Sequence, residues 1–393
     1  MGTLVLTGAA TVFSGDLAEP LLPGVDTVVC RDGVIAAVDD ADRLAADLDA
    51  ADQVIDLRGG TLAPGLIDSH GHVTFGDYSP RQRAVDYLAG YVHGGITTTV
   101  SAGEVHVPGR PRSAAGVKAL AVAAHSCFAE YRPGGMRVHA GAVLIEPTLA
   151  EADFAEMAEC GVRLAKFGFG AFAHPLDGRD QVRWAQAHGM TVMCHAGGAS
   201  AAGGAALNGE VVLALRPNVC GHANGGPTAL SPSEAELLLT ESDMALQVVQ
   251  AGNLRAALHL VRRAAESEQL HRIVVGSDTP SGFGVMPLAV LKTVLELTAL
   301  GGLEPAVAWS LATGNNADTW GLSAGRLAPG APADVLALAA PAGSQADTAA
   351  DALRVGDIPA ITAVVTAGEL RALPSRNTPR PAVPAVPSAP VAI

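Results

Sequence analysis

The sequence predicts an α/β fold in which a TIM-like (β/α)8 barrel is combined with a small β-sandwich domain built from both ends of the chain. Three observations lead to this prediction: short β-like segments before residue 60, alternation of apolar runs with helical stretches up to about residue 322, and strand-like texture after residue 333. The predicted parts are the sandwich at 1–60 and 323–373, the barrel at 61–322, and a Pro- and Ala-rich tail at 374–393.

The first 60 residues contain short apolar segments separated by Gly and Asp turns, a texture typical of a small β-domain. The segments are Leu4–Leu6, Thr27–Cys30, Gly33–Val38 and Val54–Leu57. Two later segments, Ala333–Leu338 and Ile361–Gly368, have the same character. We expect them to complete the sandwich, which makes this domain discontinuous in sequence.

The middle of the chain contains eight apolar runs, each followed by a stretch with helical character. The runs are Leu62–His72, Ile96–Glu104, Val138–Ile145, Arg163–Gly170, Thr191–Gly198, Val219–Gly226, Met244–Gly252 and Arg272–Pro280. Two helix starts fit the alternation, a capping box at Thr148–Glu151 and an N-cap at Ser231 followed by Pro232. Eight strand–helix units favour a closed barrel, whose active site lies at the carboxyl ends of the strands.

Composition narrows the class of protein. Hydrophobic residues make up 49% of the chain and charged residues 16%, which is typical of a densely packed soluble α/β protein. A formal charge of -14 argues against nucleic acid or an anionic membrane as partner. The sequence shows no apolar run long enough to span a membrane and no signal segment, so we expect a cytoplasmic protein. The five cysteines are scattered without CxxC spacing, which argues against disulfides and a closed structural zinc site.

Histidines at positions 70 and 72 follow an apolar run where a strand should end. Residues two apart in a strand share a face, so both imidazoles could reach one metal ion. Four further candidates each end a later apolar run: Lys166, His195, His222 and Asp278. Imidazoles with a carboxylate suit zinc, iron and related divalent ions. The pattern therefore predicts a catalytic metal site.

Each of these residues also has a structural interpretation. The two histidines at 70 and 72 could arise by chance, His195 and His222 could serve the core, and Asp278 could be a helix N-cap. Lys166 could be ion-paired or extend its ammonium group to solvent. A neutral, desolvated Lys166 could instead react with carbon dioxide to give a carbamate that bridges two metal ions.

Substrate contacts are expected from polar residues that follow the predicted strands. Side chains after the first two strands could hold a carboxylate, and amides near the seventh strand could bond a ring amide. These candidates are Tyr78, Arg81, Glu104, His106, Arg110, Gln250 and Asn253. A solvated or interface position is the alternative for the first group.

The histidine pair at 70 and 72, with the four residues that end later runs, resembles the site of the amidohydrolase superfamily. Local strings narrow the resemblance to the branch that hydrolyses cyclic enamides, over about residues 61 to 380. They include Gly76-Asp77-Tyr78, Gly225-Gly226-Pro227-Thr228, Ala312-Thr313-Gly314-Asn315 and Arg376-Asn377-Thr378-Pro379. The chain differs from that branch at two positions. The branch has a bridging glutamate where this chain has Lys166, and it has a small polar residue where this chain has Glu104. Both differences bear on which substrate the protein accepts.

The resemblance implies a binuclear site and a hydrolytic reaction. One metal would be held by His70, His72 and Asp278, the other by His195 and His222, with carboxylated Lys166 as the bridge. The ions would be zinc, with iron or manganese as alternatives. A metal-activated hydroxide would attack the amide carbonyl and Asp278 would shuttle the proton to the leaving nitrogen.

The substrate implied is a small cyclic amide, such as an enamide, a lactam or an imide, and the family favours a homo-oligomer, a dimer or tetramer. The alternative function is a mononuclear metal aminohydrolase, or deaminase, of the same superfamily. A third interpretation is a binding protein that keeps the metal for structure only.

Overall fold

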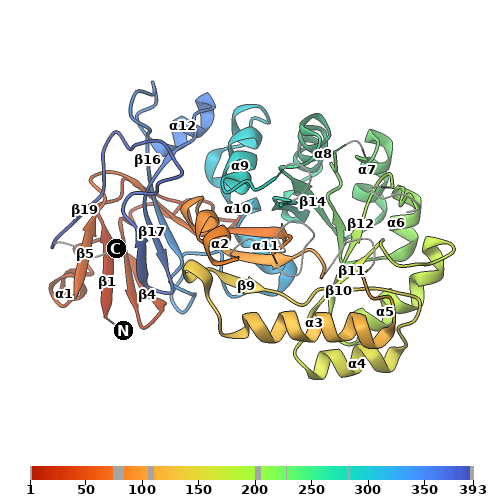
Figure 1. Ribbon diagram of the computed structural model, residues 1–393. Coiled ribbons are helices and arrows are strands. Elements are labelled where there is room, and N and C mark those ends of the chain that lie inside the picture. Colours follow the sequence, from red (N-terminus) through yellow and green to blue (C-terminus); the bar gives the residue numbers. More distant parts are fainter. Residues whose placement is uncertain are drawn as a thin grey trace.

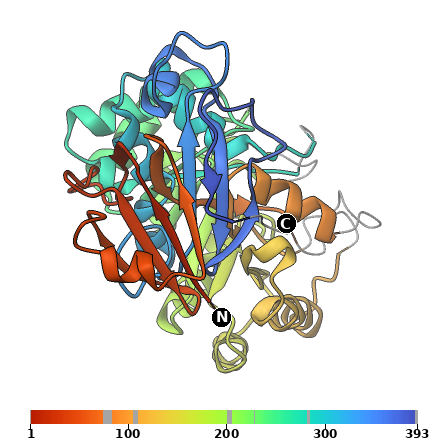
Figure 2. The ribbon, with the colours of Figure 1, turned by 90° about the vertical axis from the view of Figure 1, so that its left-hand side faces the viewer.

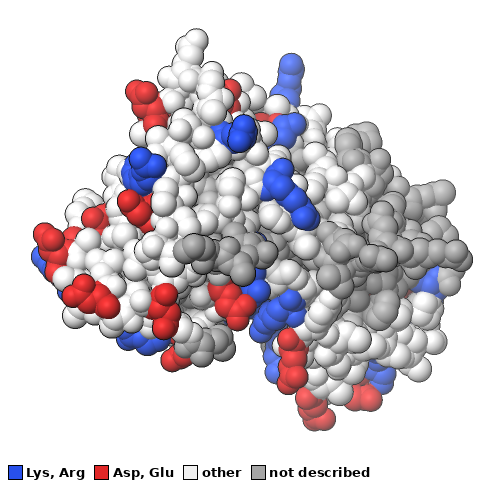
Figure 3. Space-filling model, turned by 60° about the vertical axis from the view of Figure 1, so that its left-hand side comes forward, with Lys and Arg blue, Asp and Glu red and all other residues white. Residues whose placement is uncertain are grey.

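The computed structural model describes residues 2–73, 84–104, 110–199, 205–226, 228–280 and 284–389, without the side chains of 84–86. A β-rich part carrying strands from both ends of the chain lies at one end of the molecule, and strands alternating with helices form the rest (Figure 1). On the described part of the face in Figure 3, acidic and basic side chains are interspersed among uncharged ones. Among the described helices, none is long and apolar enough to cross a membrane.

Short parallel strands form the centre of the alternating part. They are β7 (Leu66–Gly71), β8 (Ile96–Ser101), β9 (Arg137–His139), β10 (Val143–Leu144), β11 (Leu164–Phe167), β12 (Thr191–His195), β13 (Val219–Gly221), β14 (Ala245–Val249) and β15 (Ile273–Gly276). β7 to β9 form one parallel sheet and β10 to β15 another. A parallel bridge between Gly71 and Thr279 joins the end of β7 to the segment after β15.

Helices connect these strands and cover them. They are α2 (Ala84–His93), α3 (Ala114–Ala129), α4 (Glu151–Glu159), α5 (Arg179–Ala187), α6 (Gly209–Leu215), α7 (Pro232–Glu241), α8 (Leu254–Glu266), α9 (Ala289–Ala299), α10 (Pro305–Leu311) and α11 (Gly314–Trp320), with single 3-10 turns η1 (Pro133–Gly135), η2 (Pro175–Gly178) and η3 (Leu270–Arg272). One large apolar cluster fills the space between strands and helices. The chain therefore has the α/β architecture with parallel strands that the sequence predicts.

Two five-stranded sheets make up the β-rich part, in the orders β19-β5-β1-β3-β4 and β18-β17-β16-β6-β2. Their strands are β1 (Thr3–Thr7), β2 (Thr11–Val12), β3 (Thr27–Arg31), β4 (Val34–Asp39), β5 (Gln53–Asp56), β6 (Thr61–Pro64), β16 (Val335–Ala339), β17 (Ala360–Thr366), β18 (Glu369–Ala372) and β19 (Val386–Pro387), with helices α1 (Ala45–Asp49) and α12 (Ala349–Val355) beside them. Strands from the start of the chain (red) and from its end (blue) stand as neighbouring layers in Figure 2. One apolar cluster combines Leu6 and Ile55 with Val335 and Ala363.

Two predicted runs are each divided in the structure. Residues 61–64 pair with β16 as β6, and the chain then passes at Gly65 into β7. A Cβ at Gly65 would lie only 2.1 Å from the Thr97 hydroxyl oxygen, so this crossing needs glycine. The predicted run 138–145 becomes β9 and β10, separated around Gly141, whose φ of 94° interrupts the strand.

The two predicted helix starts have different outcomes. Ser231 caps α7 as predicted. Its hydroxyl accepts from the backbone amide of Glu234, and the side-chain carboxylate of Glu234 accepts from the backbone amide of Ser231 at 2.7 Å. The capping box at Thr148–Glu151 is wrong: α4 begins after Ala150, whose amide donates to Asp153 at 2.8 Å. The Thr148 hydroxyl instead donates to the Arg112 carbonyl.

The segment predicted as a tail packs on the chain itself over its described residues. β19 pairs antiparallel with β5 and so extends the first sheet. Nearer the start of the segment, the side-chain amide of Asn377 donates to the Gly90 carbonyl at 2.7 Å. The Ser375 hydroxyl donates to the His93 carbonyl at 2.5 Å. The segment therefore ties the β-rich part to α2.

Candidate active site

The structure brings the six predicted metal ligands together. Because parallel strands place their carboxyl ends at one edge, side chains at or just after those ends converge. The six are His70 in β7, His72 after β7, Lys166 in β11, His195 at the end of β12, His222 after β13 and Asp278 after β15. Two groups of side chains result, with Lys166 near both.

The first group is formed by His70, His72 and Asp278. Asp278 Oδ1 lies 3.3 Å from His70 Nε2 and 3.0 Å from His72 Nε2. One ligand atom from each residue lies within 4.8 Å of the other two, a spacing suited to a shared metal ion. The Asp278 amide donates to the His70 carbonyl at 3.0 Å, which fixes the carboxylate beside the histidines. The first described helix after Asp278 is α9, which begins at Ala289, so this geometry does not support the N-cap interpretation.

The second group is formed by His195 and His222, with His195 Nδ1 2.9 Å from His222 Nε2. His195 Nε2 lies 2.8 Å from the Gly198 carbonyl oxygen. Because a carbonyl only accepts, His195 carries its proton on Nε2, and its Nδ1 lone pair faces His222. Such a lone pair is available to a metal ion.

Lys166 lies buried near both groups, with 1% of its surface exposed, and its Nζ has no hydrogen-bond partner among the described residues. Burial lowers its pKa to about 8, although the nearby Asp278 carboxylate acts in the opposite direction. Buried amino groups without an acceptor are rare, since each forfeits the hydrogen bonds it had in water. No described carboxylate forms an ion pair with Nζ, which argues against the interpretation of Lys166 as an ion-paired residue.

Burial also sets the charge of the other candidates. It lowers the pKa of His70 and of His195 to about 4, and the Lys166 charge acts in the same direction on both. Burial alone would raise the pKa of Asp278, but the neighbouring His70 and His72 outweigh this and hold it well below its usual range. At neutral pH the site therefore offers neutral imidazoles at His70 and His195 and an ionised carboxylate at Asp278, the forms that bind metals.

Gln247, in β14, orients two of the histidines and was not among the predicted residues. Its Nε2 donates to the Ser69 carbonyl at 3.0 Å, so its Oε1 is the atom 2.6 Å from His70 Nδ1. That oxygen also accepts from the His222 amide at 3.1 Å. His70 must therefore carry its proton on Nδ1 and present a lone pair on Nε2. Its sequence signal was an amide in the middle of the apolar strand 245–249.

Asp68 is a second residue that the sequence interpretation missed. Its Oδ1 accepts from the His70 amide at 3.0 Å and from the Ser277 amide at 2.8 Å. It thereby connects the ends of β7 and β15, which carry the first group of ligands. The site depends on this buried carboxylate for the alignment of the two strand ends.

The predicted substrate contacts fall into two sets. Tyr78, Arg81 and His106 lie outside the described residues. Among the others, Gln250 Oε1 accepts from the Thr293 hydroxyl at 2.8 Å, and Asn253 caps α8 by accepting from the Ala256 amide at 3.0 Å. These contacts give Gln250 and Asn253 a structural role, and their contact with substrate stays a prediction.

Arg110 forms a buried ion pair with Glu146, at 2.6 Å, and also donates to the Phe169 carbonyl. Glu146 in turn accepts from the Ala171 amide at 2.8 Å. The pair thus links the segment after β8 to the ends of β10 and β11. Arg110 Nε is buried without a partner, so part of the guanidinium is unused by the described chain.

Glu104 is buried where β8 ends, and one of its oxygens is well bonded. Its Oε1 accepts from the Ser101 hydroxyl and from the Gly141 amide, both at 2.8 Å. Its Oε2 is buried and has no hydrogen-bond partner among the residues that the structure describes. Burial raises the pKa of Glu104 from its ordinary value of 4.5 to about 7, against the opposing effect of these hydrogen bonds. Its predicted contact with substrate remains a prediction.

Glu104→Gln is expected to stabilise the protein at pH 8 but not at pH 5. The folded pKa is raised, so the folded form keeps a proton that the unfolded chain releases, and stability falls as pH rises from about 4.5 to 7. The glutamine side chain of the variant is neutral at every pH. The free energy of unfolding of the variant should therefore rise by about 3 kcal/mol relative to wild type as the pH passes through that range. Urea unfolding at both pH values measures it, with the exposed Glu130→Gln as control. A gain that is equal at both pH values would contradict the expectation.

A model of the amidohydrolase family matches residues 61–370. The chain is 41% identical over 380 residues to enamidase from Eubacterium barkeri, covering 96% of this chain and 98% of the relative. A crystal structure of enamidase superimposes with a TM-score of 0.92 at 41% identity, covering 98% and 99% of the two chains.

Other relatives are more distant. Adenine deaminase from Deinococcus radiodurans is 29% identical over 349 residues, which are 82% of this chain and 59% of that protein. The structure of an A. niger ochratoxinase shares the fold, with a TM-score of 0.61 at 16% identity over 94% and 95% of the two chains. The family match and the 41% identity confirm the predicted resemblance and the predicted class, a hydrolase acting on C–N bonds: the chain belongs to the amidohydrolase family.

Proposed function

We propose that this protein is an enamidase-like hydrolase that opens a small cyclic amide, an enamide first and a lactam or imide as alternatives. The observation that carries the proposal is the pair of ligand groups around a buried, unpartnered Lys166. The similarity to enamidase over almost the whole chain supports the choice of substrate class. The predicted homo-oligomer and cytoplasmic location remain part of the proposal.

The described side chains fit two divalent ions. His70 Nε2 presents a lone pair to Asp278 Oδ1 at 3.3 Å with no hydrogen between them, an arrangement that a cation would stabilise. We propose that His70, His72 and Asp278 hold one ion and that His195 and His222 hold the other. Lys166, as its carbamate, would bridge them. Zinc, with iron or manganese as alternatives, suits these nitrogen and oxygen ligands.

The chemistry needs both an activated nucleophile and a polarised carbonyl. Divalent ions supply these by lowering the pKa of water and by withdrawing charge from the amide oxygen. Asp278, ionised and fixed by the His70 carbonyl, is placed to accept a proton from the attacking water and to return it to the leaving nitrogen. Gln247 keeps the His70 ring in the orientation and tautomer that this requires.

We also propose that β7 to β15 close into the (β/α)8 barrel and that the two five-stranded sheets form the β-sandwich domain. Closure is supported by the Gly71–Thr279 bridge and by a cluster of apolar side chains from β8 and from β11 to β15 that meet one another. The sandwich is supported by the apolar cluster that the two sheets share. The proposed domain limits stay those predicted, except that residues 61–64 and residues 386–387 join the sheets of the sandwich.

Gln247→Leu is expected to weaken metal binding by about 10- to 100-fold, because the His70 ring loses the acceptor that fixes it. Gln247→Glu, which keeps an oxygen beside His70 Nδ1, should bind metal more tightly than the leucine variant. Calorimetric titration of zinc into metal-free protein measures both, with the buried Gln181→Leu as control. Equal affinity in all variants would remove Gln247 from this role.

Turnover of a cyclic enamide tests the proposed function. The probe is 6-oxo-1,4,5,6-tetrahydronicotinate with metal-loaded protein, followed by loss of the ultraviolet absorbance of the conjugated enamide. The saturated lactam of the same ring is the matched comparison, and chelator-treated protein is the control. Metal-dependent turnover of the enamide supports the proposal. Folded, metal-loaded protein that turns over neither compound would overturn the enamidase assignment.

A deaminase is the second candidate, supported by the 29% identity to adenine deaminase. It would act on an exocyclic amino group with one metal ion, as the mononuclear prediction states. Release of ammonia from adenine and from related aminated rings would favour it. Ring opening without ammonia release would favour the cyclic amide hydrolase.

A further inference from the structure

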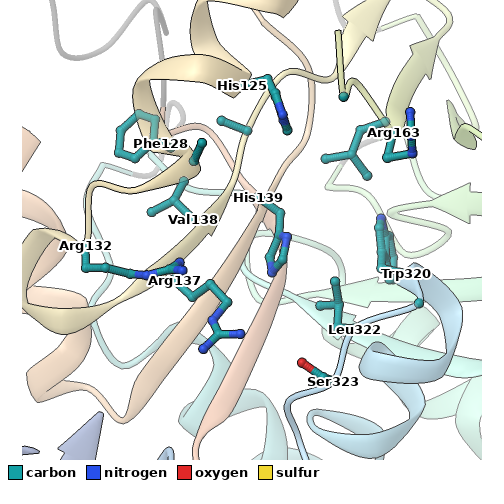
Figure 4. Close-up of a pocket in the computed structure, with 15 residues that line it drawn as sticks. His125, Phe128, Arg132, Arg137, Val138, His139, Arg163, Trp320, Leu322 and Ser323 are labelled. Carbon is teal, nitrogen blue, oxygen red and sulfur yellow. The ribbon is translucent and has the colours of Figure 1, made fainter. Parts of the chain in front are cut away.

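A pocket of about 490 Å³ lies at the amino ends of the parallel strands, away from the metal ligands at their carboxyl ends. The end of α3, the whole of β9, the start of β11 and the end of α11 form its walls. In Figure 4, His139 lies between Arg137 and Trp320 at the centre of these residues. Its volume is in the range of sites for small organic ligands.

Positive charge is concentrated in this pocket although the whole chain carries -14. Arg132, Arg137 and Arg163 line it together with His125 and His139, and no Asp or Glu does. Within the part of the chain that the structure describes, no carboxylate lies within ion-pair distance of these three arginines, although the buried Asp334 carboxylate is near enough to interact electrostatically with Arg132 and Arg137. Arg163 donates to the Ala158 and Val162 carbonyls near the end of α4, so its described partners are neutral groups.

Two polar atoms in the pocket are buried and have no hydrogen-bond partner in the described part of the chain, Arg137 Nε and His139 Nε2. The two residues stand two apart in β9 and therefore point to the same side of the strand. Burial lowers the pKa of His139 to about 4, and the charges of Arg137, Arg132 and His125 act in the same direction. The buried Arg137 Nε, which has no acceptor among the described residues and lies among other cationic side chains, is in an environment that an anion would relieve.

The remaining walls of the pocket are apolar and partly aromatic. Phe128, Val138, Leu164 and Leu322 line it together with Trp320, a residue that is 8% exposed. We propose that this pocket binds a small organic anion, with a carboxylate or phosphate group held by Arg132 and Arg137 and a flat apolar body packed against Trp320. Arginine forks match the oxygens of both head groups.

This site is separate from the metal centre. Leu164 and Lys166 point to the same side of β11, but Leu164 belongs to the apolar cluster with Met193, Val274 and Trp320, whereas Lys166 lies among the ligands. That cluster stands between the pocket and the metal ligands. The proposal therefore does not depend on the proposed function.

Trp320 fluorescence in the metal-loaded protein tests the proposal. Benzoate and phenyl phosphate are the anionic probes, and benzamide is the neutral control. We expect a saturable change with one or both anions, retained in Trp184→Phe and lost in Trp320→Phe. Arg132→Gln and Arg137→Gln should each weaken binding by about 10-fold or more, and the surface variant Arg183→Gln should not.

Three results would overturn the proposal: an equal response to benzamide, unchanged affinity in both pocket arginine variants, or benzoate that only competes with substrate while the Trp320 signal stays constant. The last would place the anion at the metal centre. Arg132 is exposed, so its variant keeps the test decisive if Arg137→Gln fails to fold. The two anionic probes distinguish a carboxylate from a phosphate ligand.

Discussion

Asp278→Asn is expected to lower kcat by about 1000-fold or more while leaving the protein folded. The amide has the size of the carboxylate but lacks its charge, so it can neither accept the proton nor neutralise a cation beside His70 and His72. The thermal unfolding temperature should change little or rise, because catalytic groups are often placed at a cost in stability. Steady-state kinetics and calorimetry of the metal-loaded protein measure both quantities.

Asp42→Asn is the matched control for this change, since Asp42 is exposed on the β-rich part of the chain. We expect it to leave kcat and the unfolding temperature as in wild type. Near-full activity of the Asp278 variant would mean that another group moves the proton. A variant that is inactive because it fails to fold would be recognised by the loss of its cooperative unfolding transition.

Lys166→Ala is expected to reduce bound metal from about two ions per chain to about one and to lower kcat by a similar factor of about 1000 or more. The buried amine has a lowered pKa and no partner, so a fraction of it is neutral and able to react with carbon dioxide at neutral pH. Elemental analysis and kinetics measure the two effects. A small carboxylic acid such as propionate should restore part of both, because its carboxylate can occupy the place of the carbamate.

Lys292→Ala is the control, since this lysine is half-exposed on α9. It should retain metal content and activity. If Lys166→Ala kept both ions and full turnover, the bridge would be wrong. If wild type itself binds one ion and does not need Lys166, the mononuclear deaminase interpretation would gain support.

The convergence of the candidate ligands could be predicted because each lies at the end of an apolar run. The local sequence alone places His195 or Asp278 at a strand end, and the parallel arrangement brings those ends together. Gln247 and Asp68 could not be assigned in this way. Their partners are 177 and 209 residues away in the sequence, so their roles follow only from the tertiary contacts.

The fold could be predicted at the level of its alternating units but not at two of their boundaries. The run from Leu62 reads as one apolar strand, whereas the crossing at Gly65 is imposed by contact with Thr97. The helix start at Thr148 also differs, because α4 begins two residues later, after Ala150, and the Thr148 hydroxyl donates to the Arg112 carbonyl. At Gly65 a contact between distant residues sets the boundary, and at Thr148 the boundary moves by two residues.

The pairing of β19 with β5 has a consequence for how the protein is made. Residue 56 is synthesised some 330 residues before its partner at 386. In the same way, β6 is synthesised well before β16, with which it pairs. At about 5–20 residues per second, the outer edge of β5 stays unpaired for roughly 15–65 s in each round of translation. An unpaired strand edge is a template for association with other chains. Nascent copies on one messenger are therefore most exposed to mispairing through β5, and slow translation of the last third of the chain would lower the soluble yield.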